Sequence, residues 1–331
     1  MTGAPGWLGT RFVEALTRGF DGQAPSGKDR RVRCLVLDGV EATALERLGA
    51  EVVRGDVRDL DSLKRCLDGM ESVFHLAGVI HPGRPRELFA VNTRGTENVL
   101  TAAIAAGAKR FIYVSSNAVG GIRRWRRIMA ESEPDRPYMS YGKSKWLAEQ
   151  SLKRAHERGQ IEAVILRPCW FYGPGQPARQ TRFFKMIKAG NPIVFGDGRN
   201  LRSMSYLDNT VQALQLAEVA PRAAGQLYWI ADERPYSTLE IYETVARLLD
   251  VKQFKPRFVP GLVSELCMYA DAVFQALGFY QTEIHVAGEM NKDIACLITK
   301  AKQELGYRPQ VELEEGMRRS IRWCRQTGQK I

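Results

Sequence analysis

Residues 2 to 9 read TGAPGWLG and carry a glycine at every third position. Glycines at this spacing let the backbone turn tightly and approach a pyrophosphate, and the last one lets the next helix pack closely on a sheet. The amides at the N-terminus of that helix then face the phosphates. The stretch predicts a dinucleotide-binding turn made of Gly3, Gly6, Trp7, Leu8 and Gly9.

Short β-branched runs alternate with helical stretches between this turn and about residue 170. Such alternation is typical of a parallel sheet with crossover helices. We therefore expect an α/β protein with a Rossmann-type, doubly wound parallel sheet. The predicted strands lie at 31 to 38, 51 to 56, 72 to 78, 109 to 116 and 162 to 168.

A smaller C-terminal domain is expected to be interleaved with this sheet. After Pro168 the pattern breaks into loops rich in glycine and proline, and it resumes with a helix at 206 to 218 and a strand at 225 to 231. We expect a dinucleotide-binding domain at 1–168 and 205–232, and a substrate-binding domain at 169–204 and 233–331.

The first strand of the sheet has almost no room in this sequence, because only Met1 precedes Thr2. That strand is central in this fold class, so its loss would leave buried backbone groups unpaired at about 1 to 3 kcal/mol each. We expect a truncated first strand and a destabilised chain, and we hypothesise that the natural protein begins upstream. Residues 20 to 30 are too polar to replace the strand.

The composition is that of a soluble globular protein, with 331 residues of which 44% are hydrophobic. No apolar run approaches the about 20 residues that cross a bilayer, and no signal peptide follows Met1, so we expect a cytoplasmic protein. The net charge of +11 is densest at 123 to 127. We expect a solvated loop there and no nucleic-acid binding, with an anion-attracting rim of the active site as the alternative.

The segment at 260 to 280 is helical and rich in large apolar residues, although Glu265 and Asp271 interrupt it. We expect a helix that packs inside the smaller domain, with a helix lying on a membrane surface as the alternative.

Cysteines and histidines do not indicate a metal site. The six cysteines lie far apart and form no CxxC pair, so we expect buried, reduced thiols rather than disulfides. The four histidines show no ligand spacing, and His75, near the end of a predicted strand, is interpreted as structural.

Asp38 ends the first predicted strand after the glycine turn. A carboxylate there can accept hydrogen bonds from both ribose hydroxyls of an adenosine and would repel a 2′-phosphate, which favours NAD over NADP. Asp38 follows Gly9 by 29 residues, more than the usual ~20. We interpret the polar segment at 19 to 30 as a loop insertion that explains the difference.

Tyr141 and Lys145 lie four residues apart in a good helical sequence, so both point from one face of the helix. A nearby ammonium and an oxidised nicotinamide favour the phenolate, which lets Tyr141 exchange a proton with a substrate hydroxyl. Ser116, at the carboxyl end of a predicted strand, can donate a hydrogen bond to the substrate oxygen. We predict that these three residues are catalytic.

A series of motifs in one order now resembles a known family, the extended short-chain dehydrogenases/reductases. This group includes nucleotide-sugar epimerases and dehydratases and 3β-hydroxysteroid dehydrogenases. The matching stretches are TGAPGWLG (2 to 9), GDVRD (55 to 59), FHLAG (74 to 78), NTRGTENVL (92 to 100), VSS (114 to 116), YGKSK (141 to 145), RPCWFYGPG (167 to 175), GDGRNLRS (196 to 203), YLDN (206 to 209) and TKAKQELGYRP (299 to 309).

The resemblance implies further NAD contacts. Asp56 and Val57 would border the adenine, and Asn92 would lie near the nicotinamide ribose. The dinucleotide would be lined by Leu76, Ala77 and Gly78, and the carboxamide would rest on Pro168 and Cys169. The resemblance also implies a homodimer, in which the helix at 92 to 106 and the Tyr141 helix pack against their copies.

The substrate-facing positions leave two classes open. The residues after Ser116 are Asn117 and Ala118 rather than an acidic pair, which argues against sugar 4,6-dehydration. Arg202 resembles the arginine that grips a nucleotide-sugar diphosphate. However, Trp170 replaces a frequent asparagine, Gly120 replaces a common tyrosine, and Asn209 is more like the 3β-hydroxysteroid branch. We assign Asn117, Trp170 and Arg202 to substrate binding.

We therefore expect an NAD-dependent enzyme that transfers hydride at a secondary alcohol or ketone, with a nucleotide sugar as the first candidate substrate. The alternatives are a 3β-hydroxysteroid-type dehydrogenase that acts on an apolar alcohol, and a dinucleotide-binding regulator without turnover.

Overall fold

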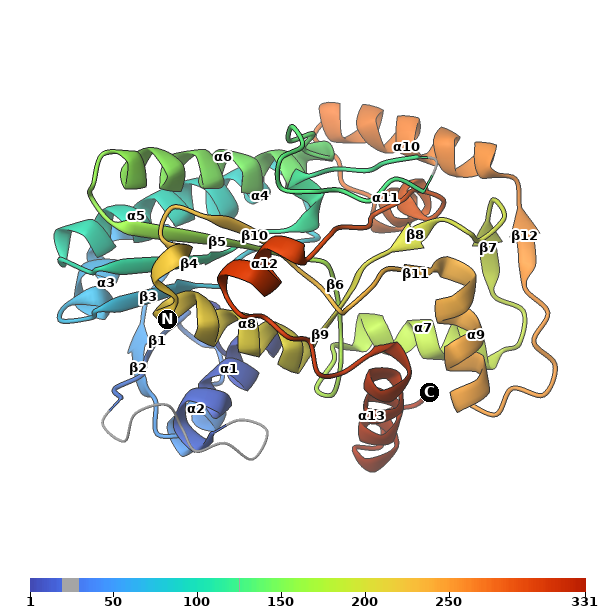
Figure 1. The fold of residues 1–331 in the computed structure, drawn as a ribbon, viewed down its shortest axis with the longest axis horizontal. Helices are drawn as coiled ribbons and strands as arrows, with labels where there is room; N and C mark the ends of the chain where they lie inside the picture. Colours follow the sequence, from blue (N-terminus) through green and yellow to red (C-terminus); the bar gives the residue numbers. More distant parts are fainter. Residues whose placement is uncertain (20–29, 125) are drawn as a thin grey trace.

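A twisted parallel sheet forms the N-terminal half of the computed structural model, which describes residues 1–19, 30–124 and 126–331. Its strands run in the order β2, β1, β3, β4, β5, β10, with Thr2 bridging β1 and β3. Figure 1 shows helices on both faces of this sheet. The strands are β1 (Arg33–Val36), β2 (Glu51–Arg54), β3 (Ser72–His75), β4 (Arg110–Val114), β5 (Glu162–Pro168) and β10 (Leu227–Ile230).

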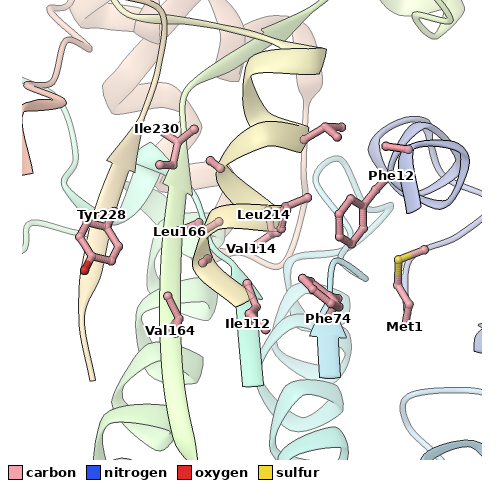
Figure 2. Packing of buried hydrophobic residues seen from close by; sticks show 14 of the residues in the cluster. Met1, Phe12, Phe74, Ile112, Val114, Val164, Leu166, Leu214, Tyr228 and Ile230 are labelled. Atoms are coloured by element: carbon pink, nitrogen blue, oxygen red, sulfur yellow. The ribbon is translucent and has the colours of Figure 1, made fainter. Parts of the chain in front are cut away.

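Successive side chains of the strands point to opposite faces of the sheet, and a separate set of helices covers each face. Ile112 and Val114 of β4 face one core, which Figure 2 shows closing on Leu214 of α8, and Phe111 and Tyr113 face the other. The first core is covered by α1 (Trp7–Arg18), α2 (Thr43–Arg47), α8 (Leu207–Val219) and α12 (Thr299–Glu304). The second is covered by α3 (Leu60–Leu67), α5 (Thr96–Ala105) and α6 (Met139–Glu157).

Short turns link several of these elements. They are α4 (Pro85–Leu88), the π-helical turn η1 (Phe89–Gly95) that runs directly into α5, and the 3₁₀ turns η2 (Asn117–Val119) and η3 (Pro221–Ala223).

The predicted sheet is confirmed, and Met1 and Thr2 lie between β1 and β3. The amide of Thr2 donates to the carbonyl of Phe74 at 2.9 Å, and the amide of Leu35 donates to the carbonyl of Met1 at 2.8 Å. These two residues join β1 to β3 at one end, and their side chains belong to the core or lie buried beside it. The polar segment expected as a loop insertion lies mostly outside the described residues.

His75 fixes this junction. Its ring is fully buried, with Nδ1 2.6 Å from the Thr2 hydroxyl and Nε2 2.8 Å from the hydroxyl of Thr96. Burial lowers the pKa of His75 to about 3. The neutral ring therefore ties Thr2 to α5 through β3, in keeping with the structural interpretation.

A second group of elements surrounds a third core that includes Phe184, Val194, Ile241 and Met317. Strands β6 and β9 pair in parallel, as do β7 and β12, and β8 pairs with β11 in the antiparallel sense. The strands are β6 (Trp170–Tyr172), β7 (Ile193–Phe195), β8 (Leu201–Arg202), β9 (Met204–Tyr206), β11 (Tyr236–Ser237) and β12 (Arg257–Val259). The helices that contribute to this core are α7 (Ala178–Lys188), α9 (Thr238–Leu248) and α13 (Leu313–Gln326). Two further helices in this part of the chain are α10 (Gly261–Ala276) and α11 (Thr282–Glu289), which pack against each other.

The basic run at 123 to 127 is not a uniformly solvated loop, so that prediction is wrong for its first residue. Arg123 is buried, donates to the carbonyl of Gly120 at 2.6 Å and pairs with Glu133 at 3.6 Å. Its backbone exchanges hydrogen bonds with Asp293. Arg124, Arg126 and Arg127 are exposed, and Trp125 lies outside the described residues.

Candidate active site

The glycine turn packs on the end of β3 so closely that side chains would not fit. Gly3 has φ +88°, and a Cβ there would lie 2.6 Å from the amide nitrogen of Ala77. A Cβ at Gly6 or at Gly9 would lie 2.7 or 2.5 Å from the carbonyl oxygen of Gly3. Helix α1 starts directly after Gly6, and within the described chain no side chain caps it. Its first amides are therefore available to phosphate oxygens.

Gly3→Ala is expected to destabilise the protein by more than the about 1 to 2 kcal/mol of a left-handed backbone alone, because the new methyl would strike the backbone of Ala77. It should also weaken NAD binding at least about tenfold by displacing the turn. Gly107→Ala is the matched control, since Gly107 has φ +70° with no described atom within 4 Å of the added Cβ. Thermal unfolding and NAD titration measure both effects, and equal losses in the two variants would show that the close packing is unimportant.

Two carboxylates predicted to contact the adenosine, those of Asp38 and Asp56, differ in whether another side chain already holds them. Asp38 lies two residues beyond β1 and is exposed, in a turn held by Arg54, which donates to the carbonyls of Leu37 and Val40. The carboxylate of Asp56 instead accepts hydrogen bonds from the guanidinium and the backbone amide of Arg58, which lower its pKa. Asp38 is thus the carboxylate that faces solvent.

Gly78, Asn92 and Lys145 come together beyond the end of β3. A Cβ at Gly78 would lie 3.2 Å from Oδ1 of Asn92 and 3.3 Å from Nζ of Lys145. Asn92 is fully buried and exchanges hydrogen bonds with the backbone of Val79 at 2.8 and 2.9 Å. Leu76 and Ala77 are half-buried beside the glycine turn, and Val57 is buried.

Lys145 is buried on α6, and its Nζ donates to the carbonyl of Val114 at 2.9 Å, where β4 ends. Burial lowers the pKa of Lys145 to about 8, against the opposing effect of the Glu149 carboxylate. At neutral pH the side chain therefore remains mostly an ammonium.

The Ser116 hydroxyl acts on the Tyr141 phenol and lowers its pKa. Ser116 is buried and also caps η2, accepting from the amide of Ala118 and donating to Oδ1 of Asn117, both at 3.2 Å. Burial raises the pKa of Tyr141 above its ordinary value of 10. The expectation that Lys145 lowers it is not met in the protein alone, where Ser116 and the guanidinium of Arg179 are the groups that lower it.

Pro168 and Cys169 are buried at the end of β5. The Cys169 thiol lies 3.3 Å from that of Cys296, so two cysteines that are far apart in the sequence meet as free thiols. Cys267 is half-buried, whereas the sequence analysis expected all six cysteines to be buried.

Trp170 and Arg202, both predicted to bind substrate, lie together. The guanidinium of buried Arg202 is 5.5 Å from the Trp170 ring, which remains 37% exposed. Nη2 of Arg202 donates to the carbonyl of Glu289 at 2.8 Å. Burial lowers the pKa of Arg202, opposed by the Glu289 charge.

The departures from the family pattern at Gly120 and Asn209 have local explanations. A Cβ at Gly120 would lie 2.5 Å from the Trp229 ring, so Trp229 occupies the space of a side chain there. Asn209 is buried and donates to Asp232 at 3.0 Å and to the carbonyl of Val311 at 2.8 Å. Asn209 thus joins parts of the fold.

A cluster on α10 and α11 beside Tyr141 was not predicted. His285 lies 2.7 Å from Asp271, and its ring lies 5.4 Å from that of Tyr280, whose hydroxyl is 3.2 Å from His81. Glu289 acts on the site as well, since its charge raises the pKa of Tyr141. The fold brings His81 next to residues 271–289, which lie far from it in the sequence. No spacing pattern in the sequence indicates this cluster.

A buried ion cluster behind Lys145 was also missed. Glu149, fully buried one helical turn after Lys145, accepts from the Ser115 hydroxyl at 2.5 Å and from Nε of Arg167 at 2.8 Å. Arg167 also pairs with Asp135 at 2.7 Å and lies 5.2 Å from the Trp229 ring.

A glycine turn at the start of α1, an exposed carboxylate after β1, and a serine, tyrosine and lysine at the end of β4 and on α6 together define a short-chain dehydrogenase/reductase. A sequence model of the NAD dependent epimerase/dehydratase family matches residues 1–231. The chain belongs to this family and is an NAD-dependent enzyme, which confirms the resemblance and the predicted cofactor. Within the part of the chain that the structure describes, no helix is both long enough and apolar enough to cross a membrane.

Curated relatives align with most or all of the chain. An uncharacterized protein, y4nL, of Sinorhizobium fredii is 44% identical over all of this chain and 96% of its own. UDP-glucose 4-epimerase of Vibrio cholerae is 28% identical over 97% of this chain and 93% of its own. The 3beta-hydroxysteroid-dehydrogenase/decarboxylase isoform 2 of Arabidopsis thaliana is 29% identical over 86% of this chain. The aligned region covers only 54% of that longer protein.

Solved structures share the fold. The crystal structure of gox2253 aligns with a TM-score of 0.81 at 24% identity, over 100% of this chain and 98% of that one. UDP-glucuronic acid 4-epimerase from Bacillus cereus, in complex with NAD, aligns with a TM-score of 0.75 at 21% identity, over 99% of this chain and 98% of that one.

Proposed function

We propose that this enzyme moves hydride between NAD and a secondary alcohol or ketone, and that the substrate is a nucleotide sugar. The observation that carries the reaction is the convergence of three groups near the end of β4: the hydroxyl of Ser116, the phenol of Tyr141, whose pKa that hydroxyl lowers, and the buried ammonium of Lys145. NAD, when bound, supplies the carbon that accepts or returns the hydride.

The residues around the glycine turn suit the dinucleotide. The uncapped start of α1 and the bare backbone at Gly3, Gly6 and Gly9 would hold the pyrophosphate, and Asp38 the adenosine ribose. Lys145 and Asn92 lie side by side next to Gly78 and would face the nicotinamide half. The other proposed contacts are Trp7, Leu8, Asp56, Val57, Leu76, Ala77, Pro168 and Cys169.

Ser116 and Tyr141 would act on the substrate oxygen. Because burial raises the pKa of Tyr141, its phenol is protonated at neutral pH and is ready to donate a proton to a ketone oxygen. Ser116 would hold that oxygen by donating a hydrogen bond, and Lys145, with NAD bound beside it, would supply positive charge that favours the phenolate left behind. In the opposite direction Tyr141 accepts the proton of the alcohol.

Asp38→Ala is expected to shift the cofactor preference toward NADP. Removing the carboxylate removes both its hydrogen bonds to the ribose and its repulsion of a 2′-phosphate. The ratio of NAD to NADP affinity should fall at least about tenfold, since one charge-assisted hydrogen bond contributes about 1.5 to 3 kcal/mol. Titration of both dinucleotides measures this ratio. An unchanged ratio would show that Asp38 does not contact the cofactor. Asp56→Ala is the comparison, because Arg58 already holds the carboxylate of Asp56.

The substrate class rests on Arg202 and Trp170. A guanidinium against an indole ring suits the diphosphate and base of a nucleotide sugar, and the epimerase of Vibrio cholerae is a full-length relative. A 3β-hydroxysteroid-type alcohol is the second candidate, because Trp170 and Phe183, with ring centroids 6.2 Å apart, offer an apolar wall.

A thermal-shift screen with NAD present separates the two classes. We expect UDP, GDP, dTDP or CDP sugars to raise the unfolding temperature and sterols to leave it unchanged. Arg202→Met should abolish the shift by nucleotide sugars while keeping the shift by NAD alone. Stabilisation by sterols only would favour the second candidate and contradict the first.

We also propose a homodimer through α5 and α6, whose outer residues Ile104, Ser151 and Arg154 line a shallow groove of about 260 Å³. Sedimentation velocity tests it. Ile104→Glu should convert a dimer to a monomer, and a wild-type monomer at all concentrations would refute it.

A further inference from the structure

Helix α10 presents its polar side to the protein. Its buried residues are Ser264, Asp271 and Gln275. Ser264 donates to the carbonyl of Ala287 at 2.7 Å, Gln275 donates to Asp271 and accepts from the amide of Ser140 at 3.1 Å, and Asp271 holds His285. The helix is therefore fixed to α11 and to the start of α6 by hydrogen bonds.

The opposite side of α10 is a stripe of large apolar side chains exposed to solvent. These residues recur at helical spacing along one face, and Figure 1 shows α10 at the outer edge of the molecule. The exposed fractions are 67% for Leu262, 60% for Leu266, 64% for Tyr269, 58% for Val273 and 66% for Leu277. We call this surface the α10 face. The expectation that this helix packs inside the smaller domain is thus wrong for its apolar side.

The acidic residues of α10 do not reach the α10 face. Asp271 is fully buried, and Glu265 is paired with both Lys292 and Arg124. An amphipathic helix of a globular protein normally buries its apolar side, so the reversed orientation indicates that something outside this chain covers it.

Cations border the α10 face. Arg124 is linked to α10 through Glu265, and Arg126 and Arg127 next to it are exposed. Lys143 is exposed and lines the groove between α6 and α10 together with Ala272 and Ala276. Arg257 is exposed on β12, which leads directly into α10.

We propose that the α10 face docks on an anionic membrane surface, with its apolar stripe in the interface and the bordering cations on the headgroups. An uncharged stripe flanked by arginine and lysine is the pattern of an interfacial helix. A second copy of this chain fits less well, because symmetric pairing would bring two cationic borders together in a protein of net charge +11. The docking does not depend on the substrate or on the reaction.

Vesicle flotation with the full chain tests this proposal. The protein should float with phosphatidylcholine vesicles that contain phosphatidylserine, bind vesicles of phosphatidylcholine alone more weakly, and be released by salt. The double variant Leu266→Gln, Val273→Gln should weaken binding to the anionic vesicles at least about tenfold. Because both side chains face solvent, the unfolding temperature should hold or rise.

Two controls separate the alternatives. Val219→Gln removes an equally exposed apolar side chain, 66%, from the end of α8 and should bind vesicles as the wild type does. Lys143→Glu with Arg257→Glu should weaken binding to anionic vesicles only. The proposal is overturned if the wild type floats with neither vesicle. It is also overturned if Leu266→Gln, Val273→Gln dissociates a dimer in sedimentation while vesicle binding persists.

Discussion

Tyr141→Phe is expected to lower the rate of hydride transfer by about 10² to 10⁴-fold, the usual contribution of a positioned acid or base. The phenol is the group that we assign to proton exchange with the substrate oxygen, and the Ser116 hydroxyl lowers its pKa. Phenylalanine keeps the ring and its packing on α6, so NAD affinity and the unfolding temperature should stay close to those of the wild type. The absorbance of NADH in single-turnover reactions measures the rate.

Tyr138→Phe is the matched control for this substitution. Tyr138 lies one turn earlier, just before α6, and in the described part of the structure its buried hydroxyl has no hydrogen-bond partner. Its removal should leave turnover unchanged. If Tyr141→Phe retains wild-type turnover, or if both variants lose activity equally, then Tyr141 is not the proton donor.

Arg167→Met is expected to lower the free energy of unfolding by about 3 to 5 kcal/mol, because it leaves the buried carboxylate of Glu149 without its partner. Nε and Nη2 of Arg167 bond both oxygens of Glu149, at 2.8 and 2.5 Å, and methionine can fill only the volume. Urea unfolding measures the loss.

Arg234→Met provides the comparison on the surface. Arg234 is half-exposed and pairs with Glu240 at 2.5 Å, in water rather than in the core. Exposed ion pairs contribute about 0 to 1 kcal/mol, so this variant should unfold nearly as the wild type does. If the two arginine variants lost similar free energies of unfolding, burial of the Glu149 carboxylate would not explain the effect of Arg167→Met.

The sheet, the glycine turn and the shared helix of Tyr141 and Lys145 were predictable because local chemistry determines them. The glycine turn needs bare backbone at Gly3, Gly6 and Gly9, and the structure shows where side chains would collide. The runs that became β4 and β5 are apolar on both faces, as a sheet covered on both sides requires. Tyr141 and Lys145 share one helix, so their spacing alone places them on one side.

The features that were missed depend on contacts between distant residues. The composition of α10 suggested that its apolar side packs inward. Its polar side is buried instead, because Asp271 and Gln275 form hydrogen bonds with other elements. Arg123 was grouped with its charged neighbours, although Glu133 and the backbone of Gly120 make its burial possible. Neither partner is visible in the local pattern.

Transfer of deuterium to NAD tests the central claim most directly. The enzyme is mixed with NAD and the alcohol that gives the largest thermal shift, labelled with deuterium at the carbinol carbon. The dinucleotide is then recovered by a cold acetonitrile quench without acid, which preserves the dihydronicotinamide, and its mass is measured by mass spectrometry. We predict that the label enters the dinucleotide in the wild type and that this transfer slows by about 10² to 10⁴-fold in Tyr141→Phe. A dinucleotide that stays unlabelled in the wild type, or is labelled equally fast in the variant, would contradict the account.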